Sequence, residues 1–260
     1  MRRVLILVAA LLLGIVQAHA ANEPACGSKL CQHLVQLLPP GKDGLGPIRR
    51  WEDNGPFLYS TIGLSDESAN LFGTLLEDFG RRAGLSMQRA TPDKMRFVRI
   101  VAVNTDDPNV RANSQRVFSF AGANVTVEQA ALMANISRAI LLYKQRWPGS
   151  SEGKVERCGM FVREAQMKSD LAGFILGRQI FQCLTSFGSS EVLPSILNWK
   201  TPPRDLIGPA TVRLSVLDEA LLRLLYARGH SLFGVEPAEL VAQLEARLRA
   251  DGFRDDGSKQ

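Results

Sequence analysis

Apolar residues change their spacing along this chain, and each spacing predicts an element. Residues 57 to 62 are rich in aromatic and β-branched side chains, which is typical of a strand. Residues 66 to 83 repeat apolar positions at intervals of three and four, and Ser65 stands where a helix cap is expected. Alternation over 96 to 103 predicts a second strand. The three segments predict a β-α-β unit whose two strands lie parallel in one sheet.

The middle of the chain predicts four further elements. A short strand is expected at 116 to 120, followed by a helix that Thr126 or Asn124 opens and that runs to about Tyr143. Two more strands are expected at 158 to 162 and at 171 to 176. The second of these is apolar on both faces and is therefore expected in the centre of the sheet.

The last third is predicted to be helical. A short apolar helix is expected at 179 to 187, and an amphipathic helix at 237 to 249. Between them, Ser215 and Asp218 form an S-x-x-D cap that opens another helix, so Asp218 is explained by its place near a helix N-terminus. Residues 251 to 260 are expected to be a flexible tail.

The first twenty residues have the pattern of a secretory signal peptide. Arg2 and Arg3 precede an apolar run from Val4 to Val16, and Ala18-His19-Ala20 supplies a small-x-small cleavage site. As a retained membrane anchor the run would span only about 20 Å, short of the roughly 30 Å hydrocarbon core. A periplasmic or secreted protein is therefore predicted, with no transmembrane segment after cleavage.

The mature chain is predicted to be one main domain with an N-terminal extension. Residues 21 to 47 form that segment and a linker, because 39 to 47 are dense in proline and glycine. The domain is expected over 48 to 250. An alternative makes residues 26 to 38 a partner-binding module, in which case 21 to 47 would be exposed and apolar.

Composition and charge exclude several classes of protein. The chain has 260 residues, of which 45% are hydrophobic and 22% charged, as in an ordinary folded domain. Its net charge is +5, with basic residues scattered among acids. Because nucleic-acid binding needs a clustered basic face, we expect no nucleic-acid partner.

The four cysteines all follow the signal peptide, and an even count in an exported chain indicates disulfides. Four cysteines allow three pairings. Cys26 and Cys31 would close a short local loop, which leaves Cys158 with Cys183 as the second bridge.

Residue types that often carry catalysis are scarce. The mature chain keeps only His33 and His230, and it lacks H-x-x-x-H, G-x-S-x-G and phosphate-loop motifs. We therefore expect no metal site and no cofactor. His230 is expected to cap a helix end, His33 could bind metal only adventitiously, and Asp106 with Asp107 are expected to be solvated turn residues.

A set of short motifs occurs in this order along the chain: Ile48-Arg49-Arg50-Trp51, Cys158, Phe161-Val162, Cys183-Leu184, Pro194-Ser195-Ile196-Leu197-Asn198, Leu214-Ser215, Asp218, Leu221-Leu222 and Leu225-Tyr226. In these motifs, over about residues 45 to 250, the chain resembles a bacterial family of exported proteins known as domain of unknown function 2927.

That family in turn looks like a zincin relative. The resemblance implies an α+β fold: a mixed sheet of about four strands with a backing helix, a short central helix and C-terminal helices. Members often carry Cys-Leu-x-Glu-Glu on the active helix, whereas here Cys183-Leu184 is followed by a run without paired acids, which implies that the metal site is lost. Gly188 is expected to make the turn there.

Two functional expectations follow. The first is a non-enzymatic exported protein of the cell envelope that acts by binding or assembly, with an unknown envelope protein or ligand as partner. The alternative is a divergent metal-independent hydrolase that uses Ser189 or Ser190 with Glu191. Together with Ser186, these residues form a polar cluster where a zincin cleft would lie.

Overall fold

The computed structural model of the 260-residue chain belongs to the α+β class, as predicted. It describes residues 26–41, 44–46, 48, 51, 55–121, 126, 128–129, 138–145, 153–198, 214–227, 232 and 235–260. The predicted signal peptide and His230 lie outside these residues.

The centre of the protein is a five-stranded sheet with the order β4-β3-β5-β7-β6. Its strands are β3 (Phe57–Ile62), β4 (Met87–Arg89), β5 (Ile100–Asn104), β6 (Arg138–Gln145) and β7 (Gly153–Val162). β4, β3, β5 and β7 run parallel, while β6 pairs antiparallel to β7 at one edge. The sheet is therefore mixed, with one more strand than expected.

The predicted β-α-β unit is confirmed, with an extra strand inside it. The chain leaves β3 through helix α3 (Asp66–Arg82), forms β4 on one side of β3, and returns to form β5 on the other side. Tyr59 in β3 is paired with Ile100 in β5. The chain thus reverses its direction across the sheet between β3 and β5, which is the position where open α/β sheets bind ligands.

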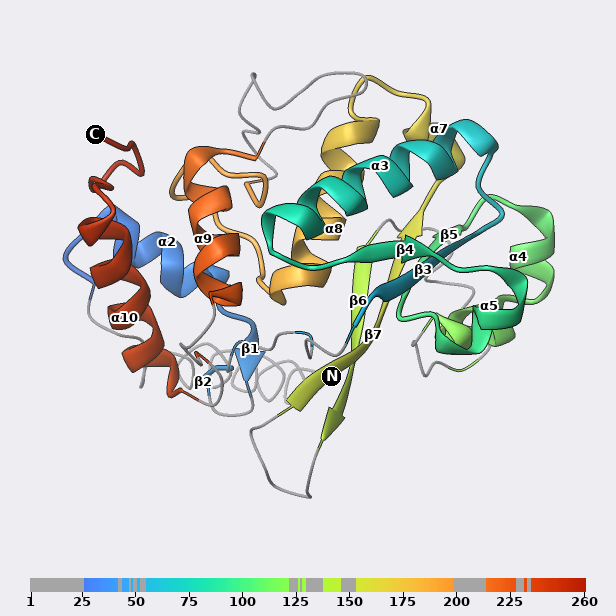
Figure 1. Cartoon of the computed structure of the whole chain (residues 1–260), viewed down its shortest axis with the longest axis horizontal. Helices are drawn as coiled ribbons and strands as arrows, with labels where there is room; N and C mark the ends of the chain where they lie inside the picture. Colours follow the sequence, from blue (N-terminus) through green and yellow to red (C-terminus); the bar gives the residue numbers. More distant parts are fainter. Residues whose placement is uncertain are drawn as a thin grey trace, which may run out of the picture.

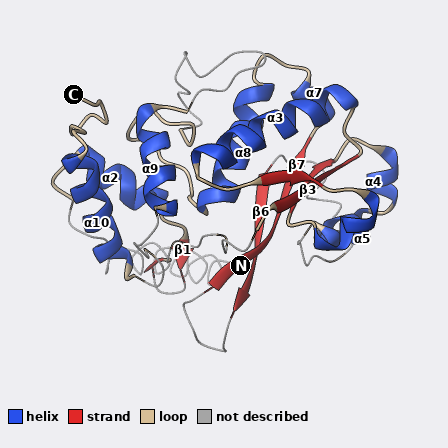
Figure 2. Cartoon of the chain, viewed as in Figure 1, coloured by secondary structure: helices blue, strands red, loops and turns tan. Residues whose placement is uncertain are grey.

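The two faces of the sheet bury separate cores. In β5, Ile100 and Ala102 belong to the large core, whereas Val101 and Val103 belong to a smaller one, because successive side chains of a strand point to opposite faces. Helices α3 and α8 (Ala172–Thr185) lie side by side over the large core, and α4 (Pro108–Ala112) and α5 (Ser114–Phe120) belong to the other face (Figures 1 and 2).

Capping residues close in sequence begin two of the predicted helices. Ser65 accepts a hydrogen bond from the Ser68 N–H and caps α3, and Ser215 with Asp218 forms a capping box at α9 (Val216–Tyr226). α10 (Pro237–Ala250) matches the predicted last helix within one residue. Within the described residues, the other elements are α2 (Lys29–Leu37), the strands β1 (Pro40–Gly41) and β2 (Gly44–Leu45), the 3-10 helix η1 (Pro92–Phe97) and α7 (Glu164–Met167).

Two predicted elements are wrong in type, and a third is wrong in its last part, with its residues 130 to 137 outside the described residues. Residues 116 to 120 belong to α5, and 171 to 176 fall largely within α8. The predicted helix over 126 to 143 ends in a strand, since β6 begins at Arg138. Both segments are helical: of residues 116 to 120 only Phe118 is buried, whereas residues 172 to 176 lie mostly in the core. A short apolar run has no periodicity that separates a helix from a strand.

The strand predicted over 96 to 103 begins later than expected. Its first residues close η1, and β5 starts only at Ile100. Pro92 stands at the start of η1, where its fixed φ favours a helical turn.

Both predicted disulfides are confirmed. Cys26 bonds to Cys31 at the start of α2, and Cys158 in β7 bonds to Cys183 in α8. The second bridge is buried and ties the sheet to its covering helix.

Helix α2 belongs to the main core, although the domain was expected to start near Ile48. Leu30, Leu34 and Leu37 are at most 1% exposed and join the large apolar cluster. The partner-module alternative required an exposed apolar segment, whereas the apolar face of α2 is covered by this chain itself.

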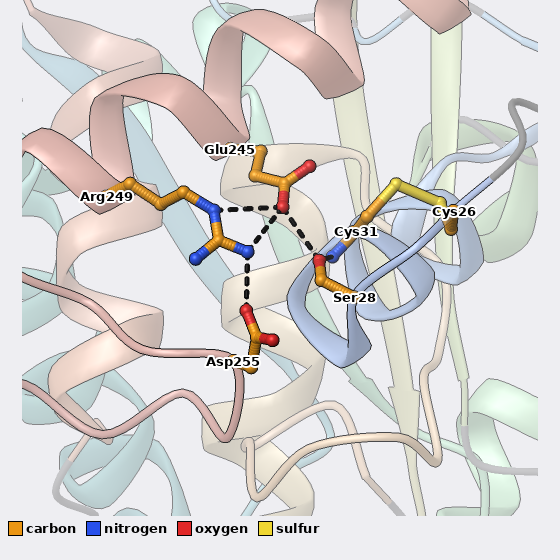
Figure 3. Close-up of a disulfide and its surroundings, with 6 residues drawn as sticks. All are labelled: Cys26, Ser28, Cys31, Glu245, Arg249 and Asp255. Carbon is orange, nitrogen blue, oxygen red and sulfur yellow. Dashed lines mark hydrogen bonds and ion pairs between the residues drawn. A yellow bond between two sulfur atoms is a disulfide. The ribbon is translucent and has the colours of Figure 1, made fainter.

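Helices α2 and α10 are joined by a polar network (Figure 3). Ser28 donates a hydrogen bond of 2.7 Å from Oγ to Glu245 Oε1, and Arg249 pairs with both Glu245 and Asp255. The tail after α10 folds back instead of extending, since Phe253 is 4% exposed and bridges to Lys259. In the part of the chain that is described, no helix has the length and apolar character needed to cross a membrane.

Candidate functional site

The carboxyl ends of three parallel strands meet at Asn104, the last residue of β5. Its Nδ2 donates a hydrogen bond of 2.8 Å to the carbonyl of Gly63, just after β3. Its Oδ1 accepts from the backbone N–H of Asp106 at 2.9 Å and of Glu164 at 3.2 Å, just after β7. One buried amide therefore fixes the relative positions of the loops that leave β3, β5 and β7.

Glu164 then links the β7 loop to the start of α3. Its Oε1 accepts hydrogen bonds from Ser65 Oγ at 2.7 Å and Ser68 Oγ at 2.9 Å. A carboxylate at this place also complements the positive end of the helix dipole. The N-terminus of α3 is thus occupied by an acceptor from the chain itself.

Asp106 and Asp107 were expected to be solvated turn residues, but each has a defined partner. Asp106 Oδ1 lies 3.1 Å from Arg111 Nη2 and 3.1 Å from Arg163 Nε. Asp107 Oδ1 accepts from the N–H groups of the first turn of α4, at 2.7 Å for Asn109. The two carboxylates have different tasks and do not form an acid–base pair.

Gly63 allows the β3 loop to approach Asp107 closely. Its φ is +71°, and a Cβ added at Gly63 would lie 2.8 Å from Asp107 Cβ. Both the backbone conformation and the short contact require glycine at this position.

A pocket of about 510 Å³ opens beside this contact, between the end of β3 and the α4–α5 pair. We call it the carboxyl-end pocket; it is lined by Ile62, Gly63, Asp107, Asn109, Val110, Asn113, Arg116, Val117 and Phe120. Its volume falls within the range of sites for small ligands, and its mixture of apolar walls with a few polar groups is typical of them. It also adjoins β3, one of the two strands between which the chain reverses across the sheet.

No family model, curated protein or solved structure matches this chain.

The structure brings Ser190 to His33, a pairing that sequence reasoning did not predict. His33 Nδ1 lies 2.7 Å from Ser190 Oγ, and the same hydroxyl lies 3.1 Å from Gln36 Oε1. Burial lowers the pKa of His33 to about 4. Both side chains are fully buried, so a substrate cannot reach the Ser190 hydroxyl unless the segment that follows α8 moves away from α2.

The other residues of the predicted polar cluster point to different partners. Ser189 Oγ accepts a hydrogen bond of 2.6 Å from Arg178, whose pKa is lowered by burial. Glu191 is exposed, and its backbone N–H donates to Gln36 Oε1. Ser186 makes the turn that was expected at Gly188, with a φ of 56° after the last residue of α8. The cluster holds a loop against α2, and Gly188 adds a backbone hydrogen bond of 2.7 Å to the Leu37 carbonyl.

Asp218 is a buried structural group that joins two distant segments. Its carboxylate accepts from Ser195 Oγ at 2.5 Å, the Ile196 N–H at 2.9 Å and Ser215 Oγ at 2.7 Å. Burial raises the pKa of Asp218, while these hydrogen bonds act in the opposite direction. The helix-start role predicted for Asp218 is confirmed, and the contact with residues 195 and 196 is additional.

Among the described residues, no three His, Cys, Asp or Glu side chains converge closely enough to hold a metal ion. His33, the histidine that could have contributed, has Ser190 as its partner. The expectation of a chain without metal or cofactor stays a prediction.

Sequence reasoning missed the residues of α4 and α5 that line the carboxyl-end pocket, foremost Asn109, Asn113 and Arg116. One signal could have found them. They follow a strand that the sequence does predict, and loops after parallel strands gather at the ligand-binding edge of a sheet. Predicting 116 to 120 as a strand removed that signal.

Proposed function

We propose that this chain is an exported protein of the cell envelope that acts by binding a small ligand in the carboxyl-end pocket. The observation that carries the proposal is the position of the pocket: a cavity of about 510 Å³ at the carboxyl end of β3, where the chain reverses across a parallel sheet.

The pocket is built on rigid supports. Asn104 holds the β3 and β5 loops together, and Asp107 caps the helix whose residues form one wall. Groups fixed in this way are organised before a ligand arrives, which reduces the entropy lost on binding.

Export to the periplasm or beyond is part of the proposal. It is supported by the leader-like first twenty residues and by two disulfides, which persist in oxidising compartments. Membership of family 2927, with its zincin-like ancestry, belongs to the same proposal and is supported by the sequence motifs alone.

A metal-independent hydrolase is the second candidate, and one observation favours it: the contact of 2.7 Å between His33 and Ser190. Three features count against it. The hydroxyl is buried, it already has Gln36 as a second partner, and the Glu191 side chain is on the surface. The arrangement better fits a buried hydrogen-bond network.

Fragment screening tests the binding function without assuming a ligand. Saturation-transfer NMR on the oxidised chain should detect fragments whose signals disappear in Val117→Trp, which fills the pocket. Val216→Trp, at a position that is 58% exposed on α9, is the matched control and should keep all signals. Thermal melts should show both variants folded. The proposal fails if folded Val117→Trp retains every fragment.

A further inference from the structure

We propose that the carboxyl-end pocket recognises a zwitterion of the amino-acid type: an amino acid or short peptide with a free ammonium group, a free carboxylate and an apolar side chain. This inference rests on the proposed binding function and names the ligand class of the same site.

The pocket presents one negative and one positive side chain. Asp107 uses Oδ1 to cap α4, with hydrogen bonds of 2.7 Å from the Asn109 N–H and 3.1 Å from the Val110 N–H. Its Oδ2 accepts no hydrogen bond from any described residue and would lie 3.0 Å from a Cβ added at Gly63. One carboxylate oxygen of the pocket therefore remains available to a donor such as an ammonium group.

Arg116 supplies the opposite charge from α5. It is exposed, and no carboxylate in the described part of the chain is paired with it. The nearby arginines differ, because Arg111 and Arg163 are both engaged by Asp106. Arg116 can thus offer a bidentate guanidinium to a ligand carboxylate.

The rest of the lining fits an apolar side chain. Ile62, Val117 and Phe120 pack against the small core, whereas Val110 is part of it, so these walls are held in place. Burial of an isobutyl or benzyl group against them would contribute the hydrophobic part of the affinity.

Charge balance separates this ligand class from the others. A phosphate or nucleotide would bring two or more negative charges to a single arginine and would also face Asp107. A simple cation would face Arg116, and an uncharged ligand would use neither the Arg116 guanidinium nor the second carboxylate oxygen of Asp107. Only a ligand that carries both signs matches both side chains.

Isothermal titration of the oxidised chain with four probes tests the proposal: leucine, leucyl-leucine, N-acetyl-leucyl-leucine and leucyl-leucinamide. Comparison of leucine with leucyl-leucine shows whether the pocket prefers a single amino acid or a short peptide. We expect at least one of them to bind, and each blocked dipeptide to bind about tenfold more weakly than leucyl-leucine, because it lacks one charged partner.

Two variants assign the charges to their side chains. Arg116→Gln should weaken leucyl-leucine about tenfold and remove its advantage over the amide, while leaving the effect of acetylation. Asp107→Asn keeps an oxygen for the α4 cap. It should weaken leucyl-leucine about tenfold and remove its advantage over the acetylated dipeptide, while leaving the effect of the amide. Arg247→Gln on α10 is the matched control and should bind as the unaltered chain does.

The outcomes are distinguishable from those of the fragment screen. If fragments bind in the pocket but neither leucine nor leucyl-leucine does, the zwitterion proposal is overturned and the binding function stands. Equal affinity of the blocked and free dipeptides also overturns it. If Val117→Trp shows that nothing binds in the pocket, both proposals fail.

Discussion

The imidazole Nδ1 of His33 lies 2.7 Å from the hydroxyl of Ser190, 157 residues further along the chain, and both side chains are buried. Ser190 Oγ also accepts from the Val192 N–H and lies 3.1 Å from Gln36 Oε1. A proton on Nδ1 satisfies all these contacts, since Ser190 then accepts from His33 and donates to Gln36. His33 Nε2 is buried with no hydrogen-bond partner among the described residues, so a second proton there would have no acceptor.

This environment predicts that the protein loses stability in mild acid. Burial lowers the pKa of His33 from 6.5 to about 4 in the folded state. Between these two pKa values the unfolded chain binds a proton at His33 that the folded chain does not. The contribution of neutral His33 to the free energy of unfolding is therefore complete above pH 6.5 and is lost as the pH falls toward 4. Between pH 7.5 and pH 5 we expect a loss of about 2 kcal/mol.

Urea denaturation at the two pH values measures this loss. His33→Gln keeps a polar group near Ser190 but does not titrate. Between pH 7.5 and pH 5 the variant should therefore lose about 2 kcal/mol less free energy of unfolding than the unaltered chain. Identical pH dependence in the two proteins would show that the folded state accepts the proton at His33.

The two disulfides should differ in their contribution to stability. Chain-entropy arguments give about 3.5 kcal/mol for the loop between Cys158 and Cys183 and about 2 kcal/mol for the short loop between Cys26 and Cys31. We expect the Cys158→Ala/Cys183→Ala double variant to lose more than the Cys26→Ala/Cys31→Ala variant, because its loop is longer and both sulfurs are in the core. Equilibrium denaturation of the oxidised proteins measures the two losses. A larger loss in the Cys26→Ala/Cys31→Ala variant would contradict this prediction.

Asp218→Asn should destabilise the protein by about 2 to 4 kcal/mol. The carboxylate accepts hydrogen bonds from Ser195, Ile196 and Ser215 in a fully buried position, and an amide would place its own N–H groups against these donors. Asp66→Asn is the control, since this exposed acid stands in the first turn of α3 and should change the free energy of unfolding by less than about 0.5 kcal/mol. Similar losses in both variants would mean that the buried network contributes little.

Gly63→Ala should disturb the carboxyl-end pocket, and Gly84→Ala offers a matched comparison. Both glycines have positive φ, of +71° and +73°, so each substitution carries a similar backbone strain of about 1 kcal/mol. At Gly84 a Cβ would have no atom within 4 Å, whereas at Gly63 it would lie 2.8 Å from Asp107 Cβ.

Gly63→Ala should therefore cost at least about 1 kcal/mol more than Gly84→Ala, and Asp107 should shift. Chemical denaturation gives the first quantity, and the amide chemical shifts of Asn109 and Val110 report the second. Equal costs would show that the β3 loop adapts freely.

Features that depend on neighbours within one turn of helix or one strand could be predicted from the amino-acid sequence. The Ser65 cap and the Ser215–Asp218 capping box act over three residues, so the starts of α3 and α9 could be predicted directly. The parallel pairing of β3 and β5 followed from the helix between them. Cysteine count and spacing sufficed for both disulfides.

Whether a buried apolar segment forms a helix or a strand depends on its tertiary contacts. The same holds for which residues meet at the candidate sites. Residues 171 to 176 are compatible with a strand or a helix, and burial against both the sheet and α3 selects α8. His33 meets Ser190, and Gly63 meets Asp107, only because the fold brings distant loops together. The carboxyl-end pocket follows from the same cause: it lies where α4 and α5 pack against the end of β3, a juxtaposition that no local spacing encodes.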